Sequence, residues 1–163
     1  MSLFKSVVKS ALGLNKKTHI QPGQAAPALD AADETGTVWT LDAARGQPFI
    51  LYFYPKDDTP GCTKESCAFR DAAPGLGALG VRVFGASMDS AGSHVAFKQK
   101  YNLNFPLLVD KDGALALRWG VQDGLVARRA TFLVDKAGIV REIWDPVSVG
   151  GHSEAVAAAL KAL

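Results

Sequence analysis

The two cysteines of the chain, Cys62 and Cys67, lie shortly after a run of apolar residues at positions 49–54. That run predicts a buried strand, and the turn at Pro60 and Gly61 predicts that a helix starts where Cys62 stands. The N-terminus of a helix offers unpaired backbone N–H groups and a partial positive charge, and both favour a thiolate over a thiol. The position of Cys62 therefore predicts a reactive cysteine.

The sixteen residues from 52 to 67 read YFYPKDDTPGCTKESC. In this string Pro55, Thr59 and Cys62 match the Pro-x-x-x-Thr-x-x-Cys motif of the peroxiredoxins, and the whole string resembles the subgroup called PrxQ or bacterioferritin comigratory protein. The resemblance extends from about residue 20 to the C-terminus and includes segments 105–110 and 129–135. It implies a thioredoxin-like fold and a thiol peroxidase that reduces hydrogen peroxide and organic hydroperoxides.

Peroxide reduction needs a nucleophile, a group that orients the peroxide and a cation. Cys62 is the expected peroxidatic nucleophile, and it must be ionised near neutral pH, although a free cysteine has a pKa of about 8.5. Thr59 is expected to orient the peroxide through its hydroxyl and to stabilise the leaving oxygen. The resemblance assigns the cation to Arg129, with the adjacent Arg128 as the reserve candidate. Pro55 is expected to shape the substrate pocket and keep water off the thiolate.

Turnover requires a second thiol, and Cys67 is the only other cysteine in the sequence. Attack on a peroxide leaves Cys62 as a sulfenic acid, which condenses with a nearby thiol to a disulfide. The resemblance implies that Cys67 is the resolving cysteine and that thioredoxin, or a similar dithiol protein, reduces the Cys62–Cys67 disulfide. Glu65 also matches the family string as a pocket residue that caps or orients the first turn. Its negative charge would disfavour the Cys62 thiolate, which argues against direct activation.

The spacing of the two cysteines also predicts a change of shape. On a regular helix, residues five positions apart lie about 140° apart around the axis, with their Cα atoms roughly 8.6 Å apart. A disulfide spans at most about 7 Å between Cα atoms. The Cys62–Cys67 bond therefore requires the first one or two turns of the helix to unwind.

Two cysteines in one chain could also serve other functions. His94 and His152 could suggest a metal site, but Cys-x4-Cys with no nearby histidine fits no usual zinc pattern, so neither a metal nor a cofactor is expected. A thiol–disulfide oxidoreductase would favour Cys-x-x-Cys, and a redox sensor would be oxidised at Cys62 without cycling. Peroxide consumption with and without thioredoxin separates these alternatives.

The rest of the sequence predicts alternating strands and helices. An early hairpin pairs residues 28–29 with 38–39 around Gly36, and a helix runs from Cys62 to about residue 76, where Pro74 and Gly75 shorten or close it. Ser90 caps a further helix. The remaining expected elements are strands at 81–86, 107–109, 131–134 and 139–144, and helices at 114–119 and 154–163. This order predicts an α/β fold, with a central mixed β-sheet flanked by helices.

Composition limits the class of protein. The 163 residues fit one domain at 20–163, preceded by an amphipathic extension at 1–19 whose apolar residues share one helical face. A net charge of +2 with scattered lysines gives no argument for a nucleic-acid partner. No stretch approaches the roughly 18 apolar residues of a membrane span. Two cysteines do not make a secretory disulfide framework, so we expect a cytoplasmic protein. We also expect a monomer.

Overall fold

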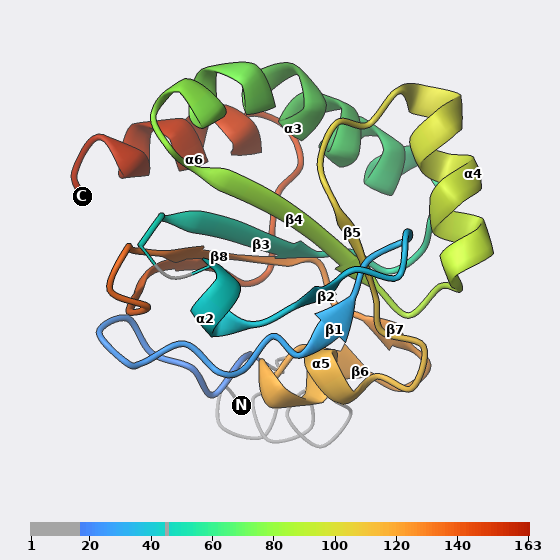
Figure 1. Ribbon diagram of the computed structural model, residues 1–163, viewed down its shortest axis with the longest axis horizontal. Coiled ribbons are helices and arrows are strands. Elements are labelled where there is room, and N and C mark those ends of the chain that lie inside the picture. The colour runs from blue at the N-terminus through green and yellow to red at the C-terminus, as the bar shows by residue number, and fades with distance from the viewer. Residues whose placement is uncertain (1–16, 45) are drawn as a thin grey trace, which may run out of the picture.

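A mixed five-stranded sheet forms the centre of the computed structural model, which describes residues 17–44 and 46–163 (Figure 1). Its strand order is β5-β4-β3-β8-β9. The strands β3 and β4 are parallel to each other, as are β4 and β5, whereas β8 pairs antiparallel with β3 and with β9. The bounds are β3 Phe49–Phe53, β4 Arg82–Ser87, β5 Leu107–Val109, β8 Ala130–Val134 and β9 Val140–Trp144. The predicted α/β class with a central mixed sheet is confirmed.

Helices cover both faces of this sheet (Figure 1). One face carries α3, α4 and α6, and the other carries the short helices α2 and α5. Every side chain of β3 is buried, because alternate residues of this central strand enter the two hydrophobic cores. The helix bounds are α2 Leu41–Ala44, α3 Pro60–Ala78, α4 Ala91–Tyr101, α5 Ala114–Arg118 and α6 His152–Leu160.

The helix that carries both cysteines is longer than predicted. It starts at Pro60, where a missing N–H group breaks no helical bond, and it ends at Ala78. The prediction that Pro74 would shorten or close the helix was wrong. Pro74 cannot donate to the carbonyl of Arg70, but the side chain of Asn104 donates to that carbonyl over 3.1 Å. This donor from outside the helix compensates for the lost bond, so α3 continues through the proline.

The early hairpin exists, but its first strand was predicted three residues too early. It pairs β1 (Ala31–Ala32) with β2 (Val38–Trp39). One carboxylate oxygen of Asp33 accepts from the backbone N–H groups of Thr35 and Thr37, over 2.8 and 3.1 Å, and so fixes the turn. Leu29 was expected in this strand but lies outside it, and its side chain is fully buried in the core.

Several smaller features complete the fold. The predicted cap of α4 is present, since the backbone N–H of Ser93 donates to the hydroxyl of Ser90 over 3.2 Å. The helix α6 starts two residues earlier than expected, at His152. Both α2 and the hairpin of β6 (Gln122–Asp123) with β7 (Val126–Ala127) were not predicted.

Most of the predicted amphipathic extension lies outside the described residues, which begin at position 17. Thr18, inside that predicted extension, donates its hydroxyl to the carbonyl of Trp119 over 2.6 Å. In the part of the chain that the structure describes, no helix has the length and apolar character needed to cross a membrane.

Candidate functional site

Cys62 is the third residue of α3 and is almost completely buried, with 1% of its surface exposed. The N–H of Thr63 donates to the carbonyl of Thr59 over 2.8 Å. The N–H groups of Gly61 and Cys62 precede that bond and have no helical carbonyl to pair with, and Pro60 has no N–H at all. The sulfur of Cys62 therefore lies at the positive end of the helix dipole, as the sequence predicted.

The guanidinium of Arg129 contacts Cys62 directly. Its Nη2 lies 3.2 Å from the Cys62 sulfur, and its Nη1 lies 2.9 Å from an Oε1 of Glu65. Gly61 makes room for this contact, because a Cβ atom at that position would lie only 3.1 Å from Nη2. The arrangement places a fixed positive charge, with its fork of N–H donors, against the sulfur.

The adjacent Arg128 points elsewhere. Its Nη2 lies 2.9 Å from an Oδ2 of Asp145 and donates to the carbonyl of Gly120 over 2.9 Å. Successive residues of an extended segment point to opposite sides, and Arg128 and Arg129 directly precede β8. Of the two arginines weighed from the sequence, the structure brings Arg129 to the cysteine.

Glu65 completes the buried group around Arg129. It is 2% exposed, and its Oε2 has no hydrogen-bond partner among the described residues. Burial raises the pKa of Glu65 to about 7, against the opposing effect of the charge and the hydrogen bond of Arg129. This carboxyl group therefore changes its charge near neutral pH, one helical turn from Cys62.

Thr59 and Pro55 lie in the loop between β3 and α3, and both are half-buried. Thr59 is the residue that precedes the first turn of α3, with extended backbone angles, but its side chain does not cap the helix. Its hydroxyl instead donates to the carbonyl of Lys56 over 2.8 Å. The oxygen of that hydroxyl keeps lone pairs that can accept a hydrogen bond from a peroxide.

Cys67 is a free thiol, as is Cys62, and it is half-buried. The Nη1 of Arg70 lies 3.6 Å from its sulfur and also donates to the carbonyl of Tyr101 over 2.8 Å. Arg70 was not predicted as a neighbour of Cys67, although residues three positions apart on a helix lie side by side and the sequence shows this spacing.

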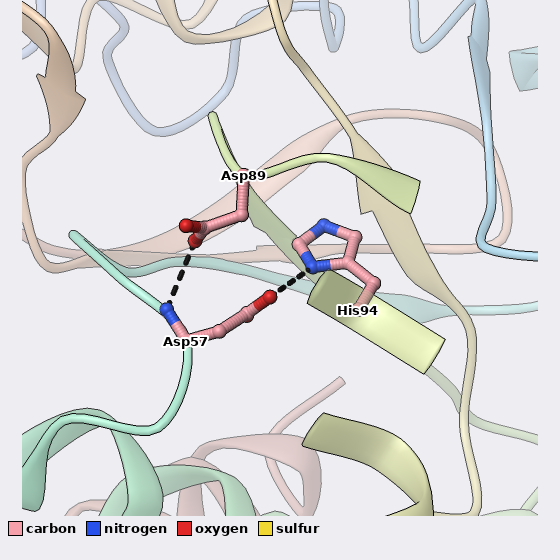
Figure 2. Close-up of side chains that lie close together, drawn as sticks. All are labelled: Asp57, Asp89 and His94. Atoms are coloured by element: carbon pink, nitrogen blue, oxygen red, sulfur yellow. Dashed lines mark hydrogen bonds and ion pairs between the residues drawn. The ribbon is translucent and has the colours of Figure 1, made fainter. Parts of the chain in front are cut away.

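One group of side chains in the described residues has atoms close enough to suggest a metal site. Asp57, Asp89 and His94 each offer a ligand atom within 4.8 Å of the others (Figure 2). Both ring nitrogens of His94 are already hydrogen-bonded, one to Asp57 and one to the carbonyl of Leu108. A metal needs a ring nitrogen without a hydrogen, so this geometry favours a hydrogen-bond network.

Known proteins share this fold and sequence. Residues 22–143 match the model of the AhpC/TSA family. The chain is 46% identical over 143 residues to a protein named putative peroxiredoxin bcp from Coxiella burnetii, and the match covers 82% of this chain and 93% of that protein.

Two solved structures are similar along almost their whole length. Peroxidoxin BcpB from Mycobacterium tuberculosis has a TM-score of 0.84 and 31% identity, and the match covers 89% of this chain and 99% of that one. The bacterioferritin comigratory protein of Xanthomonas campestris, solved in a study of its alkyl peroxide reduction, has a TM-score of 0.78 and 36% identity. That match covers 90% of this chain and 98% of the other.

A thioredoxin-like fold that holds a buried cysteine at a helix N-terminus, in a chain so similar to peroxiredoxins, defines a thiol peroxidase. The chain belongs to the AhpC/TSA family, and the relatives it resembles are peroxiredoxins of the Bcp and Q type. The predicted family, fold and enzymatic class are thereby confirmed. Enzymes of this family use a peroxide as substrate and a thioredoxin-like protein as reductant.

Proposed function

We propose that Cys62 is the peroxidatic cysteine, that Cys67 resolves it within the same chain, and that thioredoxin or a similar dithiol protein reduces the resulting disulfide. The observation that carries this proposal is the 3.2 Å contact between Nη2 of Arg129 and the sulfur of Cys62. A guanidinium in that position stabilises negative charge on the sulfur and presents further N–H donors to an incoming peroxide.

In the first step the sulfur of Cys62 attacks one oxygen of the hydroperoxide. The S–O bond forms as the O–O bond breaks, and the leaving oxygen takes up a proton to depart as water or an alcohol. Cys62 becomes a sulfenic acid. The side chain of Arg129 and the unpaired N–H groups of the first turn stabilise the charge that develops on the oxygens. The hydroxyl of Thr59 orients the peroxide, and Glu65 holds the guanidinium in place.

In the second step the thiol of Cys67 attacks the sulfur of the sulfenic acid, and the oxygen leaves as water. A dithiol reductant then exchanges with the Cys62–Cys67 disulfide and returns both thiols. The substrates that we propose are hydrogen peroxide and organic hydroperoxides. The alkyl peroxide reduction named for the Xanthomonas campestris protein supports the second class.

We also propose that the enzyme acts as a monomer in the cytoplasm. The only two cysteines of the sequence lie five positions apart, so the complete redox pair is supplied by one chain. An intramolecular pair of this kind needs no second subunit to complete the reaction cycle.

The test is peroxide consumption by the wild type, Cys62→Ser and Cys67→Ser, with and without thioredoxin and its reductase. We expect turnover only with the wild type, no reaction with Cys62→Ser, and a single oxidation without thioredoxin-coupled turnover with Cys67→Ser. Undiminished cycling by Cys67→Ser would show that an external thiol resolves the sulfenic acid.

The same assay separates the alternative functions. A thiol–disulfide oxidoreductase would reduce insulin disulfides and leave peroxide unconsumed. A redox sensor would be oxidised once by peroxide and would not cycle with thioredoxin.

A further inference from the structure

A buried carboxyl–imidazole pair connects the loop that leads into α3 with helix α4. Asp57 belongs to this loop, five residues before Cys62, and its side chain is 3% exposed. His94 lies in the first turn of α4 and is fully buried. Its Nδ1 is 2.7 Å from an Oδ2 of Asp57, and Figure 2 shows the two side chains pointing toward each other.

The hydrogen bonds determine the protonation of this pair. The Nε2 of His94 lies 2.9 Å from the carbonyl oxygen of Leu108, which only accepts, so Nε2 carries a hydrogen. Asp57 accepts from the hydroxyls of Tyr54 and Ser93, over 2.6 and 2.8 Å, as an ionised carboxylate does. The Nδ1 therefore also donates, and the pair is an imidazolium with a carboxylate.

The surroundings of His94 contain few other charges. Asp89, after β4, accepts from the backbone N–H of Asp57 over 2.9 Å. Tyr54, at the end of β3, presents its hydroxyl to Asp57, and β5 presents only a backbone carbonyl. Lys98, one turn along α4, is paired with Glu34. Burial alone would lower the pKa of His94, but the hydrogen bond and charge of Asp57 raise it above its ordinary value.

The next residue of the loop is also held by α4. Asp58 has a φ of 56°, a left-handed conformation that residues other than glycine seldom adopt. Its carboxylate accepts from Nζ of Lys100 over 2.8 Å and from the hydroxyl of Tyr101 over 2.7 Å. The loop is therefore attached to the first turn of α4 through Asp57 and to its last turn through Asp58.

We propose that His94 is a positioning residue of the peroxidase reaction, which holds the loop of residues 55–59 on α4 and thereby sets the place of Thr59 and Cys62. The inference rests on the proposed function of Cys62. The loop is the fixed end from which the first turns of α3 unwind and to which they return. Each catalytic cycle therefore brings Cys62 back to the same position beside Arg129.

The first test compares the second-order rate constant of Cys62 oxidation by hydrogen peroxide in the wild type, Asp57→Asn, His94→Gln and the double variant. Each single variant leaves a buried group without its charged partner, so we expect roughly a tenfold or greater loss of rate in folded protein. The double variant should recover part of that loss, because it removes both charges. Strictly additive losses in the double variant, or wild-type rates in both single variants, would overturn the proposal.

The matched control is His152→Gln. His152 is the other buried histidine of the described chain; it starts α6, and its Nε2 lies 2.8 Å from the hydroxyl of Thr131 in β8. Its variant should keep the wild-type rate at any pH at which it is folded, as monitored by urea titration. An equal loss in His152→Gln and His94→Gln would contradict positioning, because any missing imidazole would then have the same effect.

The pH dependence of the Cys62 oxidation rate distinguishes positioning by His94 from a purely structural role. The pKa of His94 in the folded protein is raised above 6.5, so the ion pair is complete below that pH and is lost as the pH rises through the raised value. The ratio of wild type to His94→Gln should therefore fall toward unity with rising pH, and a constant ratio would contradict the proposal.

The protonation of the His94 ring can also be measured in the wild type, without any substitution. Nitrogen-15 NMR of the reduced enzyme below pH 6.5 should show hydrogens on both ring nitrogens of His94, and a neutral ring there would overturn the proposal. Failure of the proposed function would be visible separately, as peroxide-dependent oxidation that survives Cys62→Ser.

Discussion

At the scale of single residues, the charge around Cys62 results from two groups that act in opposite directions. Arg129 places a permanent positive charge 3.2 Å from the sulfur, and Glu65 lies on the other side of the same guanidinium. The carboxyl group of Glu65 orients the guanidinium. When it is ionised, its negative charge also reduces the stabilisation that Arg129 gives to a thiolate at Cys62. The reactivity of Cys62 should therefore depend strongly on Arg129 and more weakly on Glu65.

Replacing Arg129 with alanine should slow oxidation of Cys62 roughly ten- to a hundredfold, because a charge-assisted contact of about 1.5–3 kcal/mol is lost. Arg128→Ala is the matched control, since it removes an identical side chain that bonds to Asp145 and not to the cysteine. Stopped-flow measurement of the oxidation rate constant compares them. A larger loss of rate in Arg128→Ala would mean that the two arginines exchange roles.

Glu65→Gln should change how stability depends on pH. The pKa of Glu65 is raised from 4.5 to about 7, so its proton stabilises the folded state fully below pH 4.5, and that stabilisation is lost as the pH rises through about 7. The loss amounts to on the order of 3 kcal/mol. Urea titrations on either side of this window should show a smaller pH-dependent fall in the free energy of unfolding for Glu65→Gln than for the wild type. The same fall in both proteins would contradict the raised pKa.

The sequence predicted that Cys62 lies at the start of a helix, as it does in the structure, because the turn at Pro60 and Gly61 belongs to the same short segment. It could not choose between Arg128 and Arg129 from the residues alone, since a shift of one position along an extended segment reverses which side chain faces the site. Nor did it reveal the Asp57–His94 pair, whose members are far apart in the sequence and meet only through the packing of α4.

At the scale of elements, both ends of α3 were predicted two residues inside their observed positions. The prediction was two residues late at the N-terminus, although proline is common at the first position of a helix. The C-terminus was wrong because the effect of Pro74 depends on a hydrogen bond from Asn104, which is distant in the sequence. Strands of the central sheet were predicted within about one residue, since their apolar character follows directly from burial on both faces.

Oxidation should unwind the start of α3. The reduced structure holds Cys62 and Cys67 as separate thiols on a regular helix, on which their Cα atoms would be roughly 8.6 Å apart, too far for a disulfide. We expect the segment 62–69 to become exposed and the amide hydrogens of residues 63–70 to exchange faster in the oxidised enzyme. Phe69 is 1% exposed and resists this opening, because exposing a buried phenylalanine costs roughly 1.5–3 kcal/mol.

The measurement is amide hydrogen exchange of both redox states, with the disulfide confirmed by mass spectrometry. Residues 91–101 of α4 serve as the internal reference, because neither cysteine lies on that helix. Equal protection of residues 63–70 from exchange in both redox states would show that the helix does not unwind.

At the scale of the whole molecule, the sheet brings the two parts of the site together. Phe53 at the end of β3 pairs with Ala130 at the start of β8. Arg129 therefore lies beside the end of β3, where the loop to α3 begins. A hydrophobic core covers each face of the sheet, and the two cores hold the ends of β3 and β8 in register. The alternation of strands and helices was predictable, but the pairing of β3 with β8 is a long-range contact that local patterns do not encode.

In the proposed cycle Cys62 reacts first with peroxide, and Cys67 then completes the disulfide in the same chain. Mixing the reduced enzyme with one equivalent of hydrogen peroxide, followed by peptide mapping with mass spectrometry, tests it most directly. We predict an intramolecular Cys62–Cys67 disulfide in the wild type and a sulfenic acid at residue 62 in Cys67→Ser. Oxidation of Cys67 while Cys62 remains a free thiol would contradict the account.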